Sequence, residues 1–171
     1  WEKLLQVNFW GPLYHIQAFG PAMVRRGRGH IVNLSSGQAY FRLPRWGAYA
    51  SIKVALGALS EILAFEVRRH GVEVTTVYPF MVNTGFYGSI QGDTTGMRLA
   101  MKLLPYYSMT PESVGSIVYR AVARGKRVEL VSPINRIGKL IAACDPLYVL
   151  FSMVSDLFLS GWSAAEKEEK Q

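Results

Sequence analysis

The chain has 171 residues, of which 50% are apolar and 18% are charged. This length suits one domain with a real core, and the composition is that of a globular protein rather than a disordered one. The formal net charge is +7, but the basic residues are scattered in pairs, so we do not expect nucleic-acid binding. The single cysteine excludes an internal disulfide framework and fits a reducing compartment such as the cytoplasm. The three histidines are too scattered to suggest a metal site.

Residues 1–26 carry the apolar spacing of a helix, and Gly27 follows as its end signal. Within this helix Pro12 has no N–H, so the carbonyl of Asn8 loses its i+4 partner and we expect a kink. A carbonyl freed in this way could hold a water molecule if it faces a cleft. The alternative is that Asn8 is only tolerated on the face of a helix.

A short apolar run rich in β-branched residues, 30–35, predicts a strand that gives way to a loop at Ser36. After a linker of aromatic and basic residues, 47–70 carries the apolar stripe of the longest helix in the chain. Tyr49 and Lys53 stand at positions i and i+4 near the start of this helix. Their side chains should therefore lie on one face.

These residue types suit the transfer of a proton. A tyrosine has an ordinary pKa of about 10, and a lysine cation a few ångströms away favours the phenolate. Lowering that pKa to about 7 needs roughly 4 kcal/mol, which a close cation in a dry cleft can supply. A serine hydroxyl across the cleft could hold a carbonyl oxygen at the same time. We therefore expect Lys53 to lower the pKa of Tyr49, and Ser36 to lie near both.

Residues 72–78 predict a second strand, which ends at Pro79. A helix between two strands implies parallel pairing with a right-handed crossover, and ligands of such sheets bind beyond the carboxyl ends of the strands. Ser36 and Pro79 should therefore lie at the same rim. Further along the chain, Thr110 predicts the N-cap of another helix, and 127–131 predicts a last short strand.

Residues 134–162 are strongly apolar, but two aspartates interrupt them, so no run of about 18 apolar residues could span a membrane. We expect two amphipathic or buried helices divided at Pro146. These helices would act as a lid, as a dimer contact or as a segment on a membrane surface. Arg136 and Lys139 beside aromatic residues would suit the membrane surface. Residues 163–171 predict a charged tail.

The strand ending in two serines, followed by Ser36, Tyr49 and Lys53 at these spacings, resembles the short-chain dehydrogenase/reductase family of NAD(P)-dependent oxidoreductases. The Tyr-x-x-x-Lys motif alone is weak support, and the preceding strand makes the match specific. Val7-Asn8, followed by an aromatic residue and Gly11, resembles the fourth helix of that family. The asparagine of that helix is the fourth catalytic residue.

The resemblance implies an α/β fold with a doubly wound parallel sheet (Rossmann-like). Residues 1–132 would form its catalytic part, 133–162 an apolar helical extension and 163–171 the tail. The glycine-rich turn with which the family cradles the cofactor pyrophosphate does not occur in this sequence. We therefore expect the chain to be the C-terminal portion of an enzyme whose first four strands lie upstream.

Residues 79–84 resemble the Pro-Gly-x-Val-x-Thr segment of the family, in which the valine backbone and the threonine hydroxyl hold the nicotinamide carboxamide. The resemblance implies these cofactor-binding residues: Tyr49, Lys53, Pro79, Val82 and Thr84. Phe80 stands where the family usually has glycine. Its bulk would either narrow the pocket or pack on an apolar substrate.

Substrate-binding candidates lie just beyond the strand ends: Ser36, Gln38, Tyr40, Phe80 and Phe86. For Gln38 and Tyr40, ordinary loop packing is an equally good interpretation. The stretch 85–107 contains glycine, methionine and aromatic residues and resembles the variable substrate lid of the family. Plain core packing is the alternative there.

The implied function is hydride transfer between NAD or NADP, with NADP slightly favoured, and an alcohol/carbonyl pair on a lipophilic substrate. Tyr49 would exchange the proton, Lys53 would lower its pKa and bind the cofactor ribose, Ser36 would orient the substrate oxygen, and Asn8 would anchor a proton relay. In this family the helix matching 47–70 packs against its twin in a neighbouring subunit, which implies a homo-oligomer.

Two other readings remain. The chain could be a non-catalytic binding or scaffold protein of the same fold, unable to hold a cofactor without the glycine-rich part. A sugar-nucleotide epimerase shares the tyrosine and the lysine, but such enzymes usually carry a larger C-terminal domain.

Overall fold

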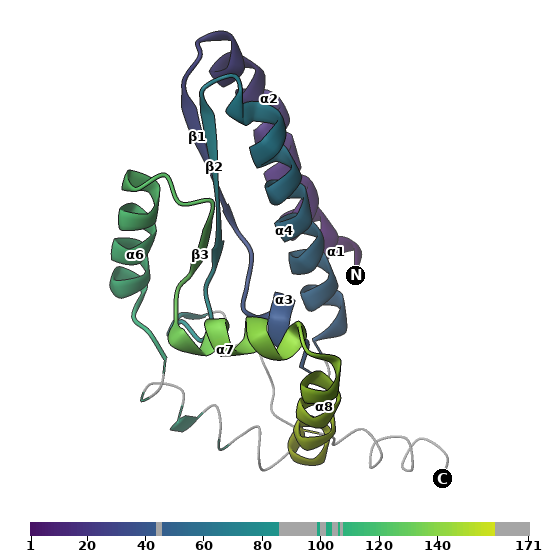
Figure 1. Cartoon of the computed structure of the whole chain (residues 1–171). Coiled ribbons are helices and arrows are strands. Elements are labelled where there is room, and N and C mark those ends of the chain that lie inside the picture. The colour runs from purple at the N-terminus through teal and green to yellow at the C-terminus, as the bar shows by residue number, and fades with distance from the viewer. Residues whose placement is uncertain (44–45, 86–98, 100–101, 104–105, 107, 160–171) are drawn as a thin grey trace.

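Three parallel strands form the centre of the fold, and helices lie on both sides of the sheet (Figure 1). The strands are β1 (Gly29–Leu34), β2 (Val72–Tyr78) and β3 (Val128–Leu130), in the spatial order β1-β2-β3. The predicted α/β fold with a parallel sheet is thereby confirmed. The computed structural model describes residues 1–43, 46–85, 99, 102–103, 106 and 108–159.

Helices α2 (Gly11–Arg25) and α4 (Gly47–Arg68) pack on one face of the sheet, and α6 (Pro111–Ala123) lies on the opposite side (Figure 1). The helix α4 connects β1 to β2, which pair in parallel with Leu34 opposite Val77. Both strands therefore end at the same rim, where the sequence predicts the site.

The core lies between α4 and the sheet. Ala64 and Val67 of α4 pack against Val72 and Val74 of β2, and the four side chains are buried. Every residue of β2 except Glu73 is buried, because helices cover both faces of this central strand.

The N-terminal helix changes its hydrogen-bond register after its first turn. The short helix α1 (Glu2–Leu5) leads into a π-helical segment, η1 (Gln6–Trp10), which precedes α2. The N–H of Gly11 donates to the carbonyl of Gln6, an i→i+5 bond that replaces the usual i→i+4 bond. The irregularity lies where we expect a kink, and it takes this form next to Pro12, which has no N–H to continue the α-helical ladder.

The linker predicted between β1 and α4 contains a short helix, α3 (Gln38–Phe41). It ends at Arg42, whose φ of 48° lies in the left-handed region, and the N–H of Arg42 donates to the carbonyl of Gln38. On the other side of the sheet, Thr110 caps α6 as predicted, because its Oγ1 accepts a hydrogen bond from the N–H of Ser113 at 3.2 Å.

The apolar extension forms two helices, α7 (Pro133–Ala142) and α8 (Asp145–Leu159). The break falls before α8, so the expectation of a division at Pro146 is wrong by a few residues. A proline is tolerated in the first turn of a helix, where its missing N–H would have no intrahelical partner. Among the residues that the structure describes, no single helix is long and apolar enough to cross a membrane. The helices α7 and α8 together have the length and composition of a membrane span, but the pair is bent by 114°.

Several predictions concern residues outside the described part of the chain. These are the substrate candidate Phe86, most of the lid-like stretch 85–107 and the charged tail 163–171.

A methyl group added at Gly57 tests the packing of α4 on β2. A Cβ atom there would lie 2.6 Å from the Tyr78 hydroxyl, so Gly57→Ala should lower the free energy of unfolding by about 1–3 kcal/mol despite the better helix propensity of alanine. In the control Gly115→Ala on α6, a Cβ meets nothing within 4 Å, and the same free energy should rise by about 0.5–1 kcal/mol. Urea denaturation measures both; equal effects would contradict this packing.

Candidate active site

Backbone hydrogen bonds on both sides of Ser36 hold it at the carboxyl rim of the sheet. The N–H of Ser35 donates to the carbonyl of Val77 at 2.8 Å, and the N–H of Gly37 donates to that of Pro79 at 2.7 Å. These two bonds continue the parallel pairing beyond the ends of both strands. Ser36 is therefore fixed beside the end of β2, and only 8% of it is exposed.

Tyr49 and Lys53 occupy neighbouring turns of one face of α4, as the spacing predicts. The Lys53 Nζ lies 5.6 Å from the centre of the Tyr49 ring, and a side-chain hydrogen bond joins Tyr49 to Ser36. The ring of Trp46 packs edge-on against Tyr49 at a centroid distance of 5.7 Å. The structure thus gathers the serine, the tyrosine and the lysine at one rim of the sheet.

The pKa of Tyr49 moves in the direction opposite to our prediction. Burial raises this pKa above its ordinary value of 10.0, and the hydrogen bond with Ser36 only partly opposes the rise. The loss of hydration of a buried phenolate outweighs its stabilisation by the hydrogen bond with Ser36. Tyr49 is therefore a neutral phenol at neutral pH and carries the proton that an acid catalyst must give.

Lys53 is also affected by burial, because only 8% of the residue is exposed. Burial lowers the pKa of Lys53 from 10.5 to about 8. Its Nζ donates to the carbonyl of Leu34 at 2.9 Å, and its own carbonyl accepts a hydrogen bond from the Ser35 hydroxyl at 2.8 Å. These two bonds tie the start of α4 to the end of β1, so the lysine has a fixed position.

Asn8 lies in the π-helical segment, on the wall of a cavity of about 480 Å³ that also reaches Lys53. The Nδ2 group of Asn8 donates to the carbonyl of Leu4 at 3.1 Å. Pro12 has no N–H and so can donate neither to Asn8 in the α register nor to Val7 in the π register. The missing N–H of Pro12 therefore removes one donor from the helical ladder beside Asn8, and π-helical segments of this kind often occur at functional sites.

The segment after β2 is held by a short parallel bridge. Val82 pairs with Met109: the N–H of Met109 donates to Met81 at 2.8 Å, and the N–H of Asn83 donates to Met109 at 2.9 Å. Because backbone groups alternate in direction along an extended segment, the N–H and C=O of Val82 itself point away from Met109. Thr84 lies two residues further on and is exposed.

The three described substrate candidates beyond Ser36 make internal contacts. The Oε1 of Gln38 accepts a hydrogen bond from the N–H of Leu43 at 3.2 Å, and the residue is 6% exposed. The ring of Tyr40 lies 5.0 Å from that of Tyr78, between centroids. The ring of Phe80 packs against Phe41 at 4.7 Å. For Gln38 and Tyr40, these contacts fit the packing interpretation.

Two residues of the rim escaped the sequence analysis. Ser35 anchors α4 through the bond to Lys53 described above. Asn135, which is fully buried in α7, donates from its Nδ2 to the carbonyl of Tyr78 at the end of β2. Its Oδ1 has no hydrogen-bond partner in the described part of the chain and lies against Gly37. The Ser132 cap predicts the start of α7, but no sequence signal places that helix across the rim.

The residues that the structure describes contain no set of metal ligands. No group of three or more histidine, cysteine, aspartate or glutamate side chains is placed to hold a metal ion in that part of the chain. The chemistry available at the rim is that of a phenol, a hydroxyl and an amine.

A family model for short chain dehydrogenases matches residues 1–95, which include all of the elements that hold the serine, the tyrosine and the lysine. The chain therefore belongs to the short-chain dehydrogenase family, and the resemblance found in the sequence is confirmed.

Two curated relatives match almost the whole chain. A fatty acyl-CoA reductase of Acinetobacter baylyi is 30% identical over 173 residues, which cover 99% of this chain and 54% of that protein. The dehydrogenase/reductase SDR family member 7B of Xenopus laevis is 30% identical over 170 residues, which cover 98% of this chain and 49% of that protein. The chain thus spans about half the length of these relatives.

Solved structures share the fold at low sequence identity. A short chain dehydrogenase/reductase of Burkholderia phymatum in complex with NAD has a TM-score of 0.68 at 22% identity, over 79% of this chain and 54% of that one. A short-chain dehydrogenase of Streptomyces avermitilis has a TM-score of 0.71 at 20% identity, over 98% of this chain and 62% of that one. These likenesses support the Rossmann-like architecture.

Removal of the buried ammonium group tests the pKa of Lys53. The pKa of Lys53 is about 8 in the folded wild type and 10.5 in the unfolded chain, so the unfolded state binds more protons between these two pH values. The free energy of unfolding of wild type should therefore rise with pH in that window. Relative to Lys53→Met, the rise should be about 3 kcal/mol. At pH 7 the methionine variant should be the more stable by about 2 kcal/mol, after loss of one hydrogen bond.

Urea denaturation from pH 7 to pH 10.5 measures this difference for the two proteins. The exposed Lys3→Met is the control and should follow wild type throughout. Parallel curves for wild type and Lys53→Met would show that Lys53 titrates like a surface lysine.

Proposed function

We propose that the protein containing this chain is an NAD(P)-dependent oxidoreductase that interconverts an alcohol and a carbonyl. The observation that carries this proposal is the hydrogen-bonded pair of Ser36 and Tyr49 with Lys53 on the same helical face. The membership in the short-chain dehydrogenase family supports it.

Tyr49 is the proton carrier of the proposed reaction. Its raised pKa keeps the phenol protonated, so it gives its proton to the substrate oxygen when a carbonyl is reduced. Ser36, which is hydrogen-bonded to that phenol, orients the same oxygen and stabilises the charge that develops on it. The protonated phenol is the form that can donate to a carbonyl oxygen at the start of a reduction.

Lys53 and Asn8 support the proton transfer. Lys53 lies on the same helical face as Tyr49, with its Nζ 5.6 Å from the centre of the tyrosine ring. Asn8 and Lys53 line the same cavity, so water in that cavity can return a proton from solvent. The donor that Pro12 removes from the helical ladder leaves a backbone acceptor for that water.

The residues present fit the nicotinamide end of the cofactor, which is the same in NAD and NADP. We propose one of these two, with NADP slightly favoured. Lys53 provides donors for ribose hydroxyls, and Val82 directs its peptide groups away from its strand partner. Pro79, Thr84 and Tyr49 complete the proposed contacts. A bound nicotinamide cofactor supplies or accepts the hydride. One structural neighbour, from Burkholderia cenocepacia, was solved with NADP.

The proposed substrate is a lipophilic carbonyl compound, with a long acyl chain favoured over a steroid or retinoid. The relative from Acinetobacter baylyi is a fatty acyl-CoA reductase. Phe80 lies beside the rim and packs on Phe41, which in turn packs on Phe151 of α8 at a centroid distance of 5.8 Å. This aromatic row joins the rim to the extension and suits an apolar substrate. Ser36 and Phe86 complete the proposed substrate contacts, with Gln38 and Tyr40 as supports.

We also propose how the chain is organised and where it works. Residues 1–132 form the catalytic part, 133–162 the extension and 163–171 the tail. The extension contacts a membrane surface from the cytoplasm, since α8 exposes several large apolar side chains. The outer face of α4 pairs with its twin in a homo-oligomer, because Ile62 and Phe65 on that face are 57% and 67% exposed.

Removal of the proton carrier tests the catalytic proposal. Tyr49→Phe in the whole protein should lower the rate of carbonyl reduction by about 10²–10⁴-fold, because the acid catalyst is lost while the packing of the ring is kept. Steady-state kinetics with a long-chain carbonyl substrate measures this loss. The control is Tyr119→Phe, which changes a tyrosine that is 74% exposed on α6.

Nicotinamide fluorescence should show that Tyr49→Phe still binds the cofactor, because the phenol hydroxyl is only one of several proposed contacts. A variant that keeps the rate of wild type would refute the role of Tyr49. If the whole protein binds no cofactor, the non-catalytic interpretation of the sequence is correct instead.

Charge placed on the outer face of α4 tests the oligomer. Ile62→Glu together with Phe65→Glu should turn the whole protein into monomers in sedimentation velocity, because two charges would have to be buried in the contact. The residues exposed on α6 offer the control Tyr119→Glu, which should leave the oligomer intact. A wild-type protein that sediments as a monomer would contradict the proposal.

A further inference from the structure

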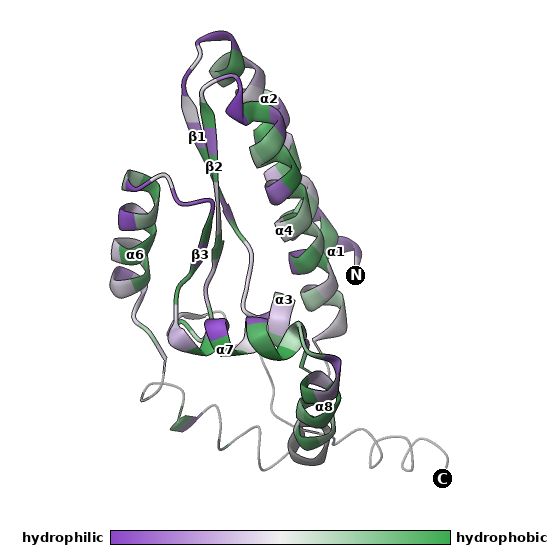
Figure 2. Ribbon diagram, in the orientation of Figure 1, coloured by the Kyte–Doolittle hydropathy of each residue, from purple (hydrophilic) through white to green (hydrophobic). Residues whose placement is uncertain are grey.

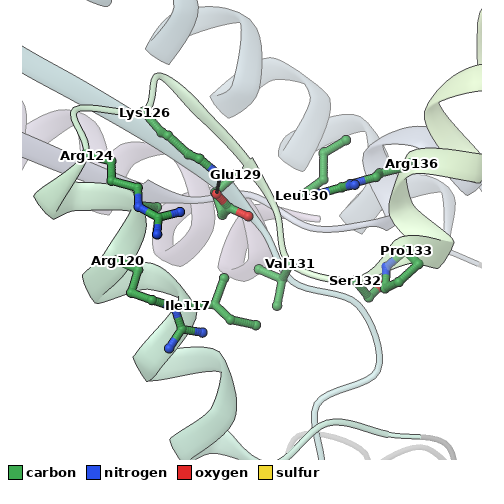
Figure 3. A pocket seen from close by; sticks show the side chains of 11 residues that line it. Ile117, Arg120, Arg124, Lys126, Glu129, Leu130, Val131, Ser132, Pro133 and Arg136 are labelled. Carbon is green, nitrogen blue, oxygen red and sulfur yellow. Dashed lines mark hydrogen bonds and ion pairs between the residues drawn. The ribbon is translucent and has the colours of Figure 1, made fainter.

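A pocket on the far side of the sheet from α4 is lined by arginine side chains. It has a volume of about 270 Å³ and lies between α6, β3 and the start of α7. Figure 3 shows Arg120 on α6, Arg124 just beyond the end of α6, and Arg136 on α7 around this pocket. We call these three residues the arginine pocket.

The charges of this pocket are unbalanced. Lys126 and Glu129 also line it, but they neutralise each other through an ion pair of 2.8 Å (Figure 3). In the part of the chain that the structure describes, no carboxylate lies within 4.0 Å of Arg120, Arg124 or Arg136. Three guanidinium groups on facing elements therefore share a concave site whose one lining carboxylate is paired with Lys126, and such a cluster can bind a phosphate group.

The helix α7 next to the pocket exposes its apolar side. Residues three apart share a face of a helix. Asn135 and Gly138 form the row that is buried against the protein. Ile134, Ile137 and Leu140 form a second row, which we call the apolar row, and they are 47%, 55% and 70% exposed. This helix therefore turns a polar residue inward and its apolar row outward.

The apolar surface continues on α8, which is hydrophobic along its described length (Figure 2). It turns Tyr148, Phe151 and Ser155 toward the protein. Exposed apolar side chains lie on its other side, at positions Leu147, Val149, Leu150, Met153 and Val154. An exposed apolar surface of this extent, bordered by cations, is typical of a helix pair that lies in a membrane interface.

We propose that the arginine pocket binds the phosphate group of an anionic membrane lipid while the apolar row and the exposed side of α8 lie in the bilayer interface. Arg136 connects the two features, because it lines the pocket and stands between Asn135 and Ile137 on α7. A lipid presents a phosphate and an acyl region together, and the chain presents a cationic pocket beside an apolar surface. This site rests on the membrane contact of the proposed function and adds the headgroup that is recognised.

Vesicle binding by the whole protein tests the site. The pocket variant carries Arg120→Gln, Arg124→Gln and Arg136→Gln. The matched control carries Arg25→Gln, Arg28→Gln and Arg68→Gln, which remove the same charge from exposed positions at the amino-terminal ends of β1 and β2. Each protein is co-sedimented with vesicles of phosphatidylcholine alone and with vesicles that also contain phosphatidylglycerol.

Wild type should prefer the vesicles that contain phosphatidylglycerol. Because each cation at an anionic surface contributes roughly a fivefold factor, the pocket variant should lose about 100-fold in partition coefficient on those vesicles. The control should stay close to wild type. Equal losses in the pocket variant and the control would overturn the proposal, because net charge alone would then explain the binding.

A charge-preserving variant separates recognition from general attraction. Replacement of the same three residues by lysine keeps the charge but removes the planar fork that binds two phosphate oxygens. It should bind the anionic vesicles on the order of 10-fold more weakly than wild type. Wild-type affinity in this variant would show that the pocket does not recognise a phosphate.

The source of the phosphate is tested with inorganic phosphate, observed by the broadening of its phosphorus NMR signal. Broadening that the pocket variant abolishes, without any vesicle binding by wild type, would assign the site to a soluble phosphate compound and overturn the lipid. Turnover of a water-soluble short carbonyl substrate without vesicles should be the same in wild type and the pocket variant. That assay therefore separates a failure of this site from a failure of the catalytic proposal.

Discussion

The parallel pairing of β1 and β2 continues beyond the strands, and the rest of the rim depends on it. The bonds from Ser35 to Val77 and from Gly37 to Pro79 fix the loop that carries Ser36. The same loop receives Lys53, since the end of β1 accepts a hydrogen bond from its Nζ. A change in register by one residue would turn the serine to the opposite face of the sheet. The positions of Ser36 and Lys53 thus depend on hydrogen bonds with the backbone at the ends of the two strands.

Burial acts on the two ionisable groups of the rim in opposite senses. It raises the pKa of the Tyr49 phenol and lowers that of the Lys53 ammonium, because both groups are more stable without charge in a poorly hydrated place. The result is a tyrosine that holds its proton and a lysine that can lose one close to neutral pH. A protonated phenol beside a hydroxyl suits the reduction of a carbonyl. Burial of the charged lysine therefore lowers the stability of the fold near neutral pH.

The extension formed by α7 and α8 packs against the rim of the sheet through specific contacts. Asn135 of α7 reaches the end of β2, and Phe151 of α8 joins an aromatic row with Phe41 and Phe80. The opposite sides of both helices expose apolar residues, and the start of α7 also lines the arginine pocket. Contact with a lipid surface and access to the rim would therefore be coupled through two short helices. Such an arrangement suits a substrate that resides in a membrane.

The amino-acid sequence by itself determined the parallel sheet, the longest helix, the family and the positions of Ser36, Tyr49 and Lys53, because these depend on local periodicity and on spacing along one helix. It predicted a disturbance near Pro12 but not its π-helical form. Only the tertiary structure decided the direction of the Tyr49 pKa, the role of Asn135, the packing of Gln38 and Tyr40 and the meeting of Arg136 with α6. Desolvation and contacts between distant elements depend on how the helices and the sheet pack together. The spacing of residues along the chain does not determine that packing.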